Sequence, residues 1–184
     1  NTIVFAETFR FESSNIEIQD NGDLIYATKG RAISSDNNFE IEADKFEYIK
    51  KNDFLKAFQN GLALIKSENL NIEFDEMSID QKSLIINANG NIKIYQREKN
   101  LLIETESIIY DRKNKTINSE AQSTLTDNKG NFFKIESFFY EIDKNIIKIK
   151  NANFTDKENN KFITSLAYIN TKSNKLFGKD ISID

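Results

Sequence analysis

The chain of 184 residues contains no histidine, cysteine, proline or tryptophan. Without histidine and cysteine it has no imidazole or thiol group for a Ser-His-Asp triad, a thiol nucleophile or a conventional zinc site. The absence of cysteine also excludes a disulfide framework, so cysteine usage says nothing about the redox compartment. No apolar run approaches the length of about 18 residues that a membrane-spanning helix needs.

The chain also lacks a strong excess of charge of either sign. The chain has 25 Lys+Arg and 29 Asp+Glu, a net charge of −4, and the basic residues are scattered among the acids. No basic stripe indicates a nucleic-acid partner. A hydrophobic fraction of 39%, with 15 Phe and 6 Tyr, is nevertheless sufficient for a packed core.

Candidate chemical groups are explained by strand geometry. Glu40 with Glu42, and Glu104 with Glu106, resemble a glycosidase carboxylate pair. Each pair occupies alternate positions on the strand face opposite the apolar residues, which favours a solvated outer surface. Residues 75–80 are rich in acids but lack the glycine of an EF-hand loop. We therefore expect no enzyme activity, no catalytic residue, no metal ligand and no cofactor.

Apolar and polar residues alternate throughout the chain. Clear examples are residues 39–43, 70–74 and 91–95. A period of two is typical of a strand with one buried and one wet face, and no long window keeps helical spacing. The sequence therefore predicts an all-β fold.

A pattern recurs about every thirty residues. An apolar residue is followed by inner positions two, five and seven residues later, with steps of 30, 31, 31, 32 and 27 residues between copies. The six copies are Phe11, Ser13, Ile16, Ile18; Ile41, Ala43, Phe46, Tyr48; Ile72, Phe74, Met77, Ile79; Ile103, Thr105, Ile108, Tyr110; Ile135, Ser137, Tyr140, Ile142; and Phe162, Thr164, Ala167, Ile169.

Each copy is followed by a polar turn and a second apolar segment. In the first three units that segment contains Gly30, Gly61 or Gly90, whereas Ser123 and Asn153 occupy the corresponding positions later. Asn, Asp, Gly and Ser cluster at both ends of every segment, as they do at turns. The chain is thus expected to form about twelve strands in six two-strand repeats, each strand pairing antiparallel with the next.

The spacing within each copy predicts a bend. An offset of three residues, from plus two to plus five, reverses the face of a strand, so both apolar pairs share one face only if an extra residue forms a bulge or corner. The glycines would allow the same bend in the partner strands. Twelve strands bent at one height form a V-shaped trough with an apolar interior, roughly 55–60 Å long.

The first residues suggest processing. Val4 and Ala6 fit the −3 and −1 positions of a signal-peptidase site. Residues 1–6 are expected to be either a signal-peptide remnant or an ordinary first strand, with residues 7–184 forming one domain.

The repeat resembles the periplasmic lipopolysaccharide-transport family, whose domains are called OstA-like or LptA-like. The residues that carry the resemblance are Ala88–Ile92 and Ile41–Tyr48, and Tyr168–Asp180 looks like the end of the periplasmic domain of the LptD family of outer-membrane LPS-assembly proteins. The loss of glycine after the third unit departs from the family pattern.

The resemblance implies a fold, a location and partners. The fold is an antiparallel V-shaped β-jellyroll, or β-taco, at the periplasmic face of the outer membrane of a Gram-negative bacterium. LPS acyl chains would slide inside the trough. An LptA-like bridge protein would dock at the N-terminal edge, around Phe9–Phe11, and an outer-membrane β-barrel with its lipoprotein partner would follow the C-terminal strand, Leu176–Ile183. The chain would then be a fragment of a longer protein.

Inner-face positions of the repeat are the candidate lipid-binding residues. They are Ile41, Phe46, Tyr48, Ile72, Met77, Ile79, Ile103, Ile108, Tyr110, Ile135 and Tyr140. Because an acidic domain attracts a polyanionic headgroup poorly, affinity for LPS would come from burial of the acyl chains, about 0.8 kcal/mol per CH₂.

Three alternatives remain open. The chain could be a free-standing LptA-like bridge protein. It could also be an adhesin or structural β-solenoid with a filled core and no lipid channel. An enzyme on a β-helix, such as a polysaccharide lyase, is disfavoured by the missing histidine and the lack of an inward carboxylate pair.

Overall fold

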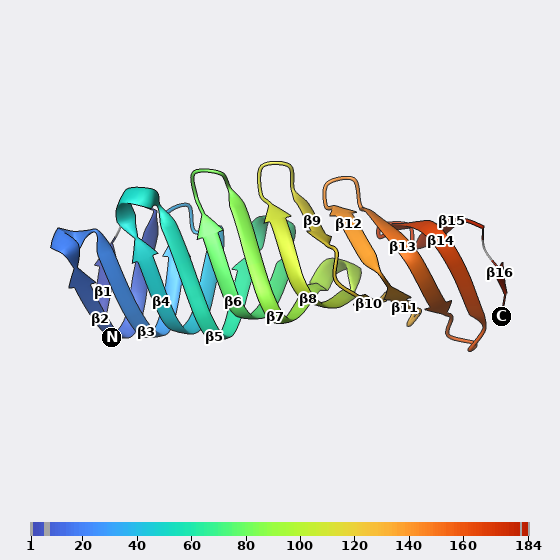
Figure 1. The fold of residues 1–184 in the computed structure, drawn as a ribbon, viewed down its shortest axis with the longest axis horizontal. Coiled ribbons are helices and arrows are strands. Elements are labelled where there is room, and N and C mark those ends of the chain that lie inside the picture. The colour runs from blue at the N-terminus through green and yellow to red at the C-terminus, as the bar shows by residue number, and fades with distance from the viewer. Residues whose placement is uncertain (1, 6–7, 181, 184) are drawn as a thin grey trace.

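All strands of the protein belong to one antiparallel sheet (Figure 1). The structure is a computed structural model and describes residues 2–5, 8–180 and 182–183. The strands are β1 (Thr2–Phe5), β2 (Phe9–Gln19), β3 (Leu24–Ser34), β4 (Phe39–Ile49), β5 (Phe54–Ile65), β6 (Leu70–Asp80), β7 (Ile85–Gln96), β8 (Leu101–Asp111), β9 (Thr116–Ser119), β10 (Ser123–Thr126), β11 (Phe132–Ile135), β12 (Ser137–Glu141), β13 (Ile146–Thr155), β14 (Lys161–Asn170), β15 (Lys175–Lys179) and β16 (Ser182–Ile183). Short 3₁₀ turns are η1 (Asp20–Gly22), η2 (Lys50–Asn52), η3 (Lys66–Glu68) and η4 (Arg97–Lys99).

The sixteen strands are the expected twelve with three of them interrupted and one added. β9 and β10 are two parts of one strand of the repeat, as are β11 and β12, and β15 and β16. β1 is an additional strand that pairs with β2. The all-β antiparallel fold predicted from the sequence is therefore confirmed. The cleavage point expected between residues 6 and 7 lies outside the described residues.

The sheet is folded into two facing walls. The first wall consists of the strand halves that end at the turns near residues 20–22, 50–52, 81–84, 112–115, 142–145 and 171–174. The second wall ends at the turns near residues 35–38, 66–68, 97–99, 127–131 and 156–160. Long strands such as β4 to β8 run from one wall through the bend into the other, and successive strands lie side by side along the long axis (Figure 1).

The bend is built by bulges in the glycine-containing strands. Register shifts occur between Phe58 and Gly61 in β5 and between Asn89 and Ile92 in β7. The predicted extra residue therefore lies in the second strand of a unit and not in the first. The reason is conformational: β7 adopts φ of +76° at Gly90 within its bulge, which glycine tolerates without strain.

Gly61 has a steric role. A Cβ atom at this position would lie 2.1 Å from the ring of Phe74 on β6, which is 3% exposed. The ring thus occupies the space that any side chain at position 61 would need. Close approach of neighbouring strands at the bend explains why the sequence places glycine here.

The sheet is interrupted where the glycine is missing from the repeat. β8 pairs with β10 near the second-wall turn and with β9 near the first-wall turn. At the gap between β9 and β10, the Oγ atoms of Ser119 and Ser123 lie 3.0 and 2.9 Å from Oγ1 of Thr105. This small buried network replaces the bulge of the earlier units.

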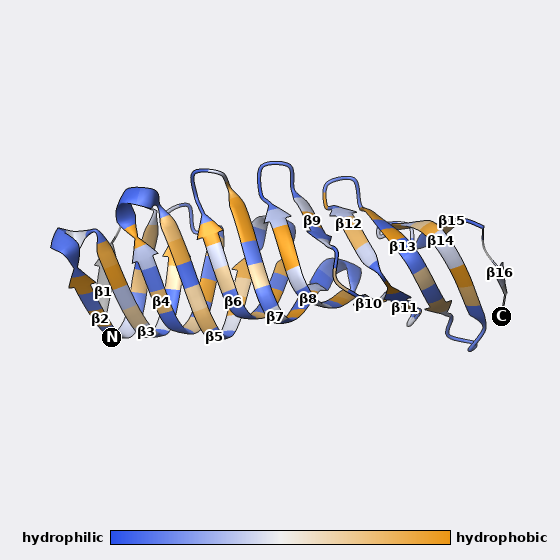
Figure 2. Ribbon diagram, in the orientation of Figure 1, coloured by the Kyte–Doolittle hydropathy of each residue, from blue (hydrophilic) through white to orange (hydrophobic). Residues whose placement is uncertain are grey.

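Apolar side chains point between the walls and form one continuous core. Figure 2 shows the resulting alternation of orange and blue along the strands, with blue turns. Among the residues that the structure describes, no helix has the length and apolar character to cross a membrane.

Candidate functional site: the interior between the walls

All eleven residues predicted to line the trough point into the interior. Their exposed fractions lie between 0% and 3%. Burial of these positions is common to a packed core and to a lipid trough, so their role in lipid binding stays a prediction.

The first wall carries an unbroken apolar row across its strands. Tyr48, Ile79, Tyr110 and Tyr140 are predicted lining residues in this row, and the register places one apolar residue from each intervening strand between them. The row reads Ile25, Tyr48, Leu55, Ile79, Ile86, Tyr110, Ile117, Tyr140, Ile147, Ile169 and Leu176.

A neighbouring row alternates large and small residues. Phe46, Met77 and Ile108 come from β4, β6 and β8, while Ala57 and Ala88 lie between them on β5 and β7. Large side chains can spread over the adjacent alanines, which allows the walls to approach closely. The sequence repeat alone identified the large members but not the alanines.

Aromatic contacts join the walls at the N-terminal end. Phe9 and Phe11 of the second wall each lie 5.8 Å, centroid to centroid, from Tyr48 of the first wall. Phe11 also lies 6.0 Å from Phe46 in an edge-on arrangement. The interior is therefore filled by the protein's own side chains here, and a guest could enter only if the walls separate.

Polar side chains close the open side of the V, opposite the bend. We call this line the mouth seam, comprising Thr8, Phe39, Asp53, Glu68, Gln96, Lys99, Arg112, Lys115 and Tyr140. Thr8 of the second wall donates a hydrogen bond to Asp53 of the first wall at 2.8 Å. The Arg112 guanidinium lies 5.5 Å above the ring of Phe39. Lys115 and Glu68 face each other at 3.8 Å.

A buried network forms the next part of the mouth seam. The hydroxyl of Tyr140 accepts a hydrogen bond of 2.7 Å from Nζ of Lys99 and donates one to the side-chain amide oxygen (Oε1) of Gln96. Burial raises the pKa of Tyr140 to about 12 and lowers the pKa of Lys99. Burial, with the nearby carboxylate of Glu68, likewise raises the pKa of Tyr110. Both tyrosines are therefore neutral at physiological pH.

Backbone hydrogen bonds between turns stay within one wall. Lys50 N bonds to Asp23 O at 2.8 Å, and Arg112 N to Leu84 O at 3.0 Å, along the first wall; Lys66 N bonds to Asn38 O at 2.9 Å along the second. In the part of the chain that the structure describes, every hydrogen bond across the mouth uses at least one side chain, as when Lys129 Nζ donates to the backbone carbonyl oxygen of Asn174 at 3.1 Å. The walls can consequently separate without loss of sheet hydrogen bonds.

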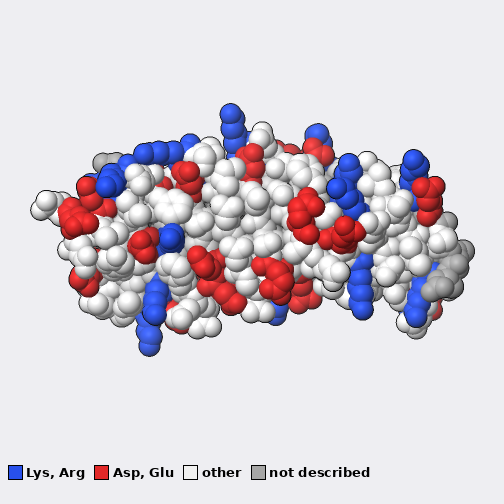
Figure 3. Space-filling model, in the orientation of Figure 1, with Lys and Arg blue, Asp and Glu red and all other residues white. Residues whose placement is uncertain are grey.

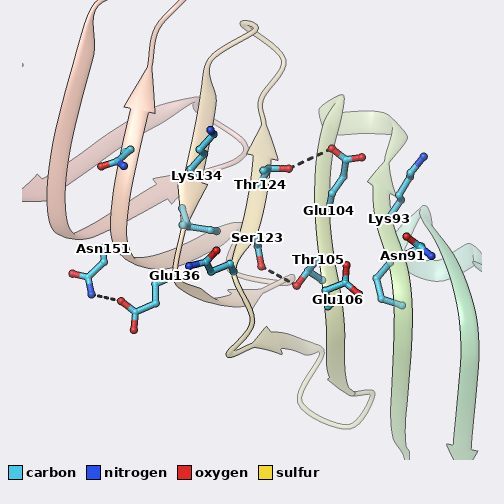
Figure 4. Close-up of a pocket in the computed structure, with 14 residues that line it drawn as sticks. Asn91, Lys93, Glu104, Thr105, Glu106, Ser123, Thr124, Lys134, Glu136 and Asn151 are labelled. Carbon is cyan, nitrogen blue, oxygen red and sulfur yellow. Dashed lines mark hydrogen bonds between the residues drawn. The ribbon is translucent and has the colours of Figure 1, made fainter.

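A large cleft lies elsewhere, on the outer surface near the bend (Figure 4). It has a volume of about 880 Å³ and is lined mainly by polar side chains of β7, β8, β10, β11 and β13, together with Gln122, Glu136 and the buried Ile92 and Ile135. Figure 4 shows Glu104 directed toward Thr124, at 3.3 Å, and Asn151 directed toward Glu136. Of the eleven predicted lining residues, only Ile135 contributes to this cleft. Its polar lining does not suit an acyl chain.

Sequence reasoning missed the mouth seam. Its residues occupy turns and strand ends that are far apart in the chain, as in the pair Gln96 and Tyr140, and only the facing of the walls brings them together. Among the described residues, no cluster of three acids could hold a metal ion.

The two ends of the sheet correct one docking prediction. The stretch around Phe9–Phe11, expected to be the free N-terminal edge, is covered by β1, which pairs Val4 with Phe11. No described strand pairs with the outer edge of residues 15–19 of β2. At the other end, β15 and β16 both pair with β14, in the segment expected to form the C-terminal strand.

No family model matches the chain, and no curated protein matches it. Among solved structures, the chain is similar to LptH of Pseudomonas aeruginosa, described as the LptA homologous periplasmic component of the conserved lipopolysaccharide transport device. The similarity covers 79% of this chain and 93% of LptH, with 9% sequence identity and a TM-score of 0.33. At these values the functional conclusion must come from the chain's own residues.

Proposed function

We propose that the protein carries lipopolysaccharide, with the acyl chains held between the two walls and the headgroup outside. The observation that supports this is the combination of an apolar interior that runs through every unit with a mouth that no described backbone-to-backbone hydrogen bond crosses. Acyl chains can replace wall-to-wall contacts with similar apolar contacts, each buried CH₂ contributing about 0.8 kcal/mol. The eleven predicted lining residues are the proposed lipid-binding residues.

Movement along the interior needs a path without deep traps. Large apolar residues recur on every second strand, as in Phe46, Met77 and Ile108, so a chain that shifts by two strands, roughly 9.6 Å, meets similar surroundings. The tyrosine hydroxyls at the mouth seam lie where headgroup oxygens would emerge. Opening requires breaking the side-chain contacts of the mouth seam, which include the pair of partly exposed Lys115 with the largely buried side chain of Glu68 and the hydrogen bonds of Tyr140.

The finer assignment is to the periplasmic domain of an LptD-type assembly protein. In this role an LptA-like bridge protein would add to the free edge of β2, and a β-barrel with its lipoprotein partner would lie beyond β15 and β16 at the outer membrane. Strand addition to an unpaired edge gives such docking its backbone hydrogen bonds. A free-standing LptA-like bridge is the alternative, and a filled-core solenoid predicts the same burial without lipid entry.

Photo-crosslinking tests the proposal. A benzophenone amino acid at Ile72, Met77 or Ile103 should capture purified LPS on illumination. The same group at Glu73 or Glu104, the exposed neighbours on the outer face, is the matched control and should not. Equal capture from both faces, or capture from neither, would reject the interior as the lipid path and favour the filled-core alternative.

A further inference from the structure

The outer face of the first wall changes character along the sheet. One cross-strand row on this face begins with polar or charged residues such as Glu47, Lys56 and Ser78. It continues through Asn87, Ile109, Asn118, Phe139, Lys148, Tyr168 and Phe177. Four of its last residues are large and exposed: Ile109 by 46%, Phe139 by 41%, Tyr168 by 39% and Phe177 by 57%. Exposed apolar groups gathered in one row indicate an interaction surface.

Lysines surround these apolar side chains. Three adjacent rows on β13, β14 and β15 form what we call the basic-aromatic face: Ile146, Asn170, Lys175; Lys148, Tyr168, Phe177; and Lys150, Leu166, Lys179. The Nζ atom of Lys148 lies 6.0 Å from the ring centre of Tyr168. Every row therefore contains a lysine and an apolar or aromatic residue; they are direct neighbours in two rows, whereas Asn170 lies between Ile146 and Lys175 in the other.

Acidic residues are absent from these three strands. β13, β14 and β15 contain lysines but no Asp or Glu, although the whole chain has a net charge of −4. The nearby acids lie at the ends of these strands: Glu141, which pairs with Lys144 at 2.6 Å, Asp143, Asp156, Glu158 and Asp180, together with Glu136, which accepts a hydrogen bond from Asn151 of β13. In the view of Figure 3, basic side chains lie above and below an uncharged surface toward the C-terminal end, with acidic side chains beside the upper ones.

We propose that the basic-aromatic face docks on the surface of an anionic lipid bilayer. The charge complementarity is local, because an acidic protein would otherwise be repelled from such a surface. Lysine stems lie along apolar surface while their ammonium groups reach lipid phosphates, and the tyrosine ring is suited to the headgroup region. Phe177, the most exposed of the large apolar residues, would enter the boundary between headgroups and acyl chains.

The shape of the face favours a bilayer over an acidic protein. Three strands spaced about 4.8 Å apart present a flat area of roughly 10 by 14 Å, with charges and rings intermixed. A protein interface concentrates apolar groups in a core and places charges at the rim. Mixing at every row suits a fluid surface whose headgroups can rearrange around each ammonium group.

Vesicle sedimentation tests this proposal without LPS, so its outcome is independent of the interior lipid path. The full chain should bind vesicles of phosphatidylglycerol and phosphatidylethanolamine, bind phosphatidylcholine vesicles weakly, and be released by high salt. Replacing Lys150 and Lys179 by Gln should lower partition about 25-fold, since each lysine near an anionic surface contributes about fivefold. The matched control replaces the exposed Lys45 and Lys93 of the N-terminal half, with the same change of charge, and should alter binding by less than about twofold.

The apolar part is tested with exposed residues whose replacement leaves the core intact. Phe177→Ser should weaken binding to anionic vesicles at least about fivefold, whereas Tyr26→Ser, in the same row on β3, should not. The proposal would be overturned if the protein failed to bind anionic vesicles, or if replacing either lysine pair lowered vesicle binding equally. Unchanged vesicle binding by Phe177→Ser would also overturn it. Complete competition by soluble poly-glutamate would do so as well, because it would identify an acidic protein as the ligand.

Discussion

Tyr140 offers a quantitative test of the mouth seam. Its hydroxyl joins the first wall to Gln96 and Lys99 of the second and is fully buried. Tyr140→Phe keeps the ring but leaves the buried side-chain amide oxygen (Oε1) of Gln96 without its hydrogen-bond donor. An unsatisfied buried group costs about 1–3 kcal/mol, so we expect the free energy of unfolding to fall by this amount.

The double variant separates this penalty from general damage. Gln96→Leu alone also loses a 3.2 Å hydrogen bond to the carbonyl of Glu68. That bond is absent from both variants that carry the leucine, so it cancels in a double-mutant cycle. We expect Tyr140→Phe to cost much less when Gln96 is already leucine, because no buried acceptor is then left unpaired.

The pH dependence provides a second measurement of the same contact. The folded-state pKa of Tyr140 is about 12, against an ordinary value of 10.0. Below pH 10 the Tyr140 hydroxyl keeps its proton in the folded and the unfolded state, so its contribution to folding stability is complete. Between pH 10 and pH 12 the unfolded state releases this proton while the folded state still holds it. Stability should therefore decline by about 2–3 kcal/mol over this range through Tyr140 alone. Tyr140→Phe lacks this contribution and should decline less.

Urea denaturation at pH 8 and at several values up to 12 measures both effects. Lys99, whose pKa burial lowers, bonds directly to the Tyr140 hydroxyl, so the two groups titrate as a pair. The difference between the curves of wild type and Tyr140→Phe therefore reports this bonded pair. Parallel curves above pH 10, together with simple additivity in the cycle, would refute the buried network.

Further predictions concern the bend and the mouth seam. Gly61→Ala should lower stability by about 1–3 kcal/mol because its Cβ would meet the ring of Phe74, and Phe74→Leu should restore part of the loss in thermal melts. Gly30→Ala should also lower stability, because its Cβ would lie 2.2 Å from the backbone carbonyl oxygen of Glu12 on the facing strand. Since a backbone atom causes this clash, replacing a neighbouring side chain should not restore the loss, and a restoration at both glycines would contradict this geometry. Lys115→Gln removes the cation beside the largely buried Glu68 carboxylate, so it should lower stability by about 1–3 kcal/mol and speed entry of a fluorescent fatty acid measured by stopped flow. Glu68→Gln should also speed entry, and unchanged entry in both variants would argue against opening at this pair.

The sequence predicted the repeating elements well because a period of two and a period near thirty are local properties. Positions such as Ile72 and Met77 follow from one strand's alternation and are buried as expected. The bulge was placed in the wrong strand of the unit, because an offset of three residues reveals a bend without saying which strand carries the left-handed residues. Residues such as Gln96 and Tyr140 meet across the walls, and no local pattern encodes that distance.

Strand continuity differs between the two halves of the molecule. From β4 to β8, each strand crosses the bend, so the walls are joined by covalent backbone and by paired neighbours. At β9 to β12 the two walls are bridged only through the short segments around Gln122 and Glu136, and their ladders run separately. We therefore expect a torque applied at either end of the molecule to deform this region first and the N-terminal half less.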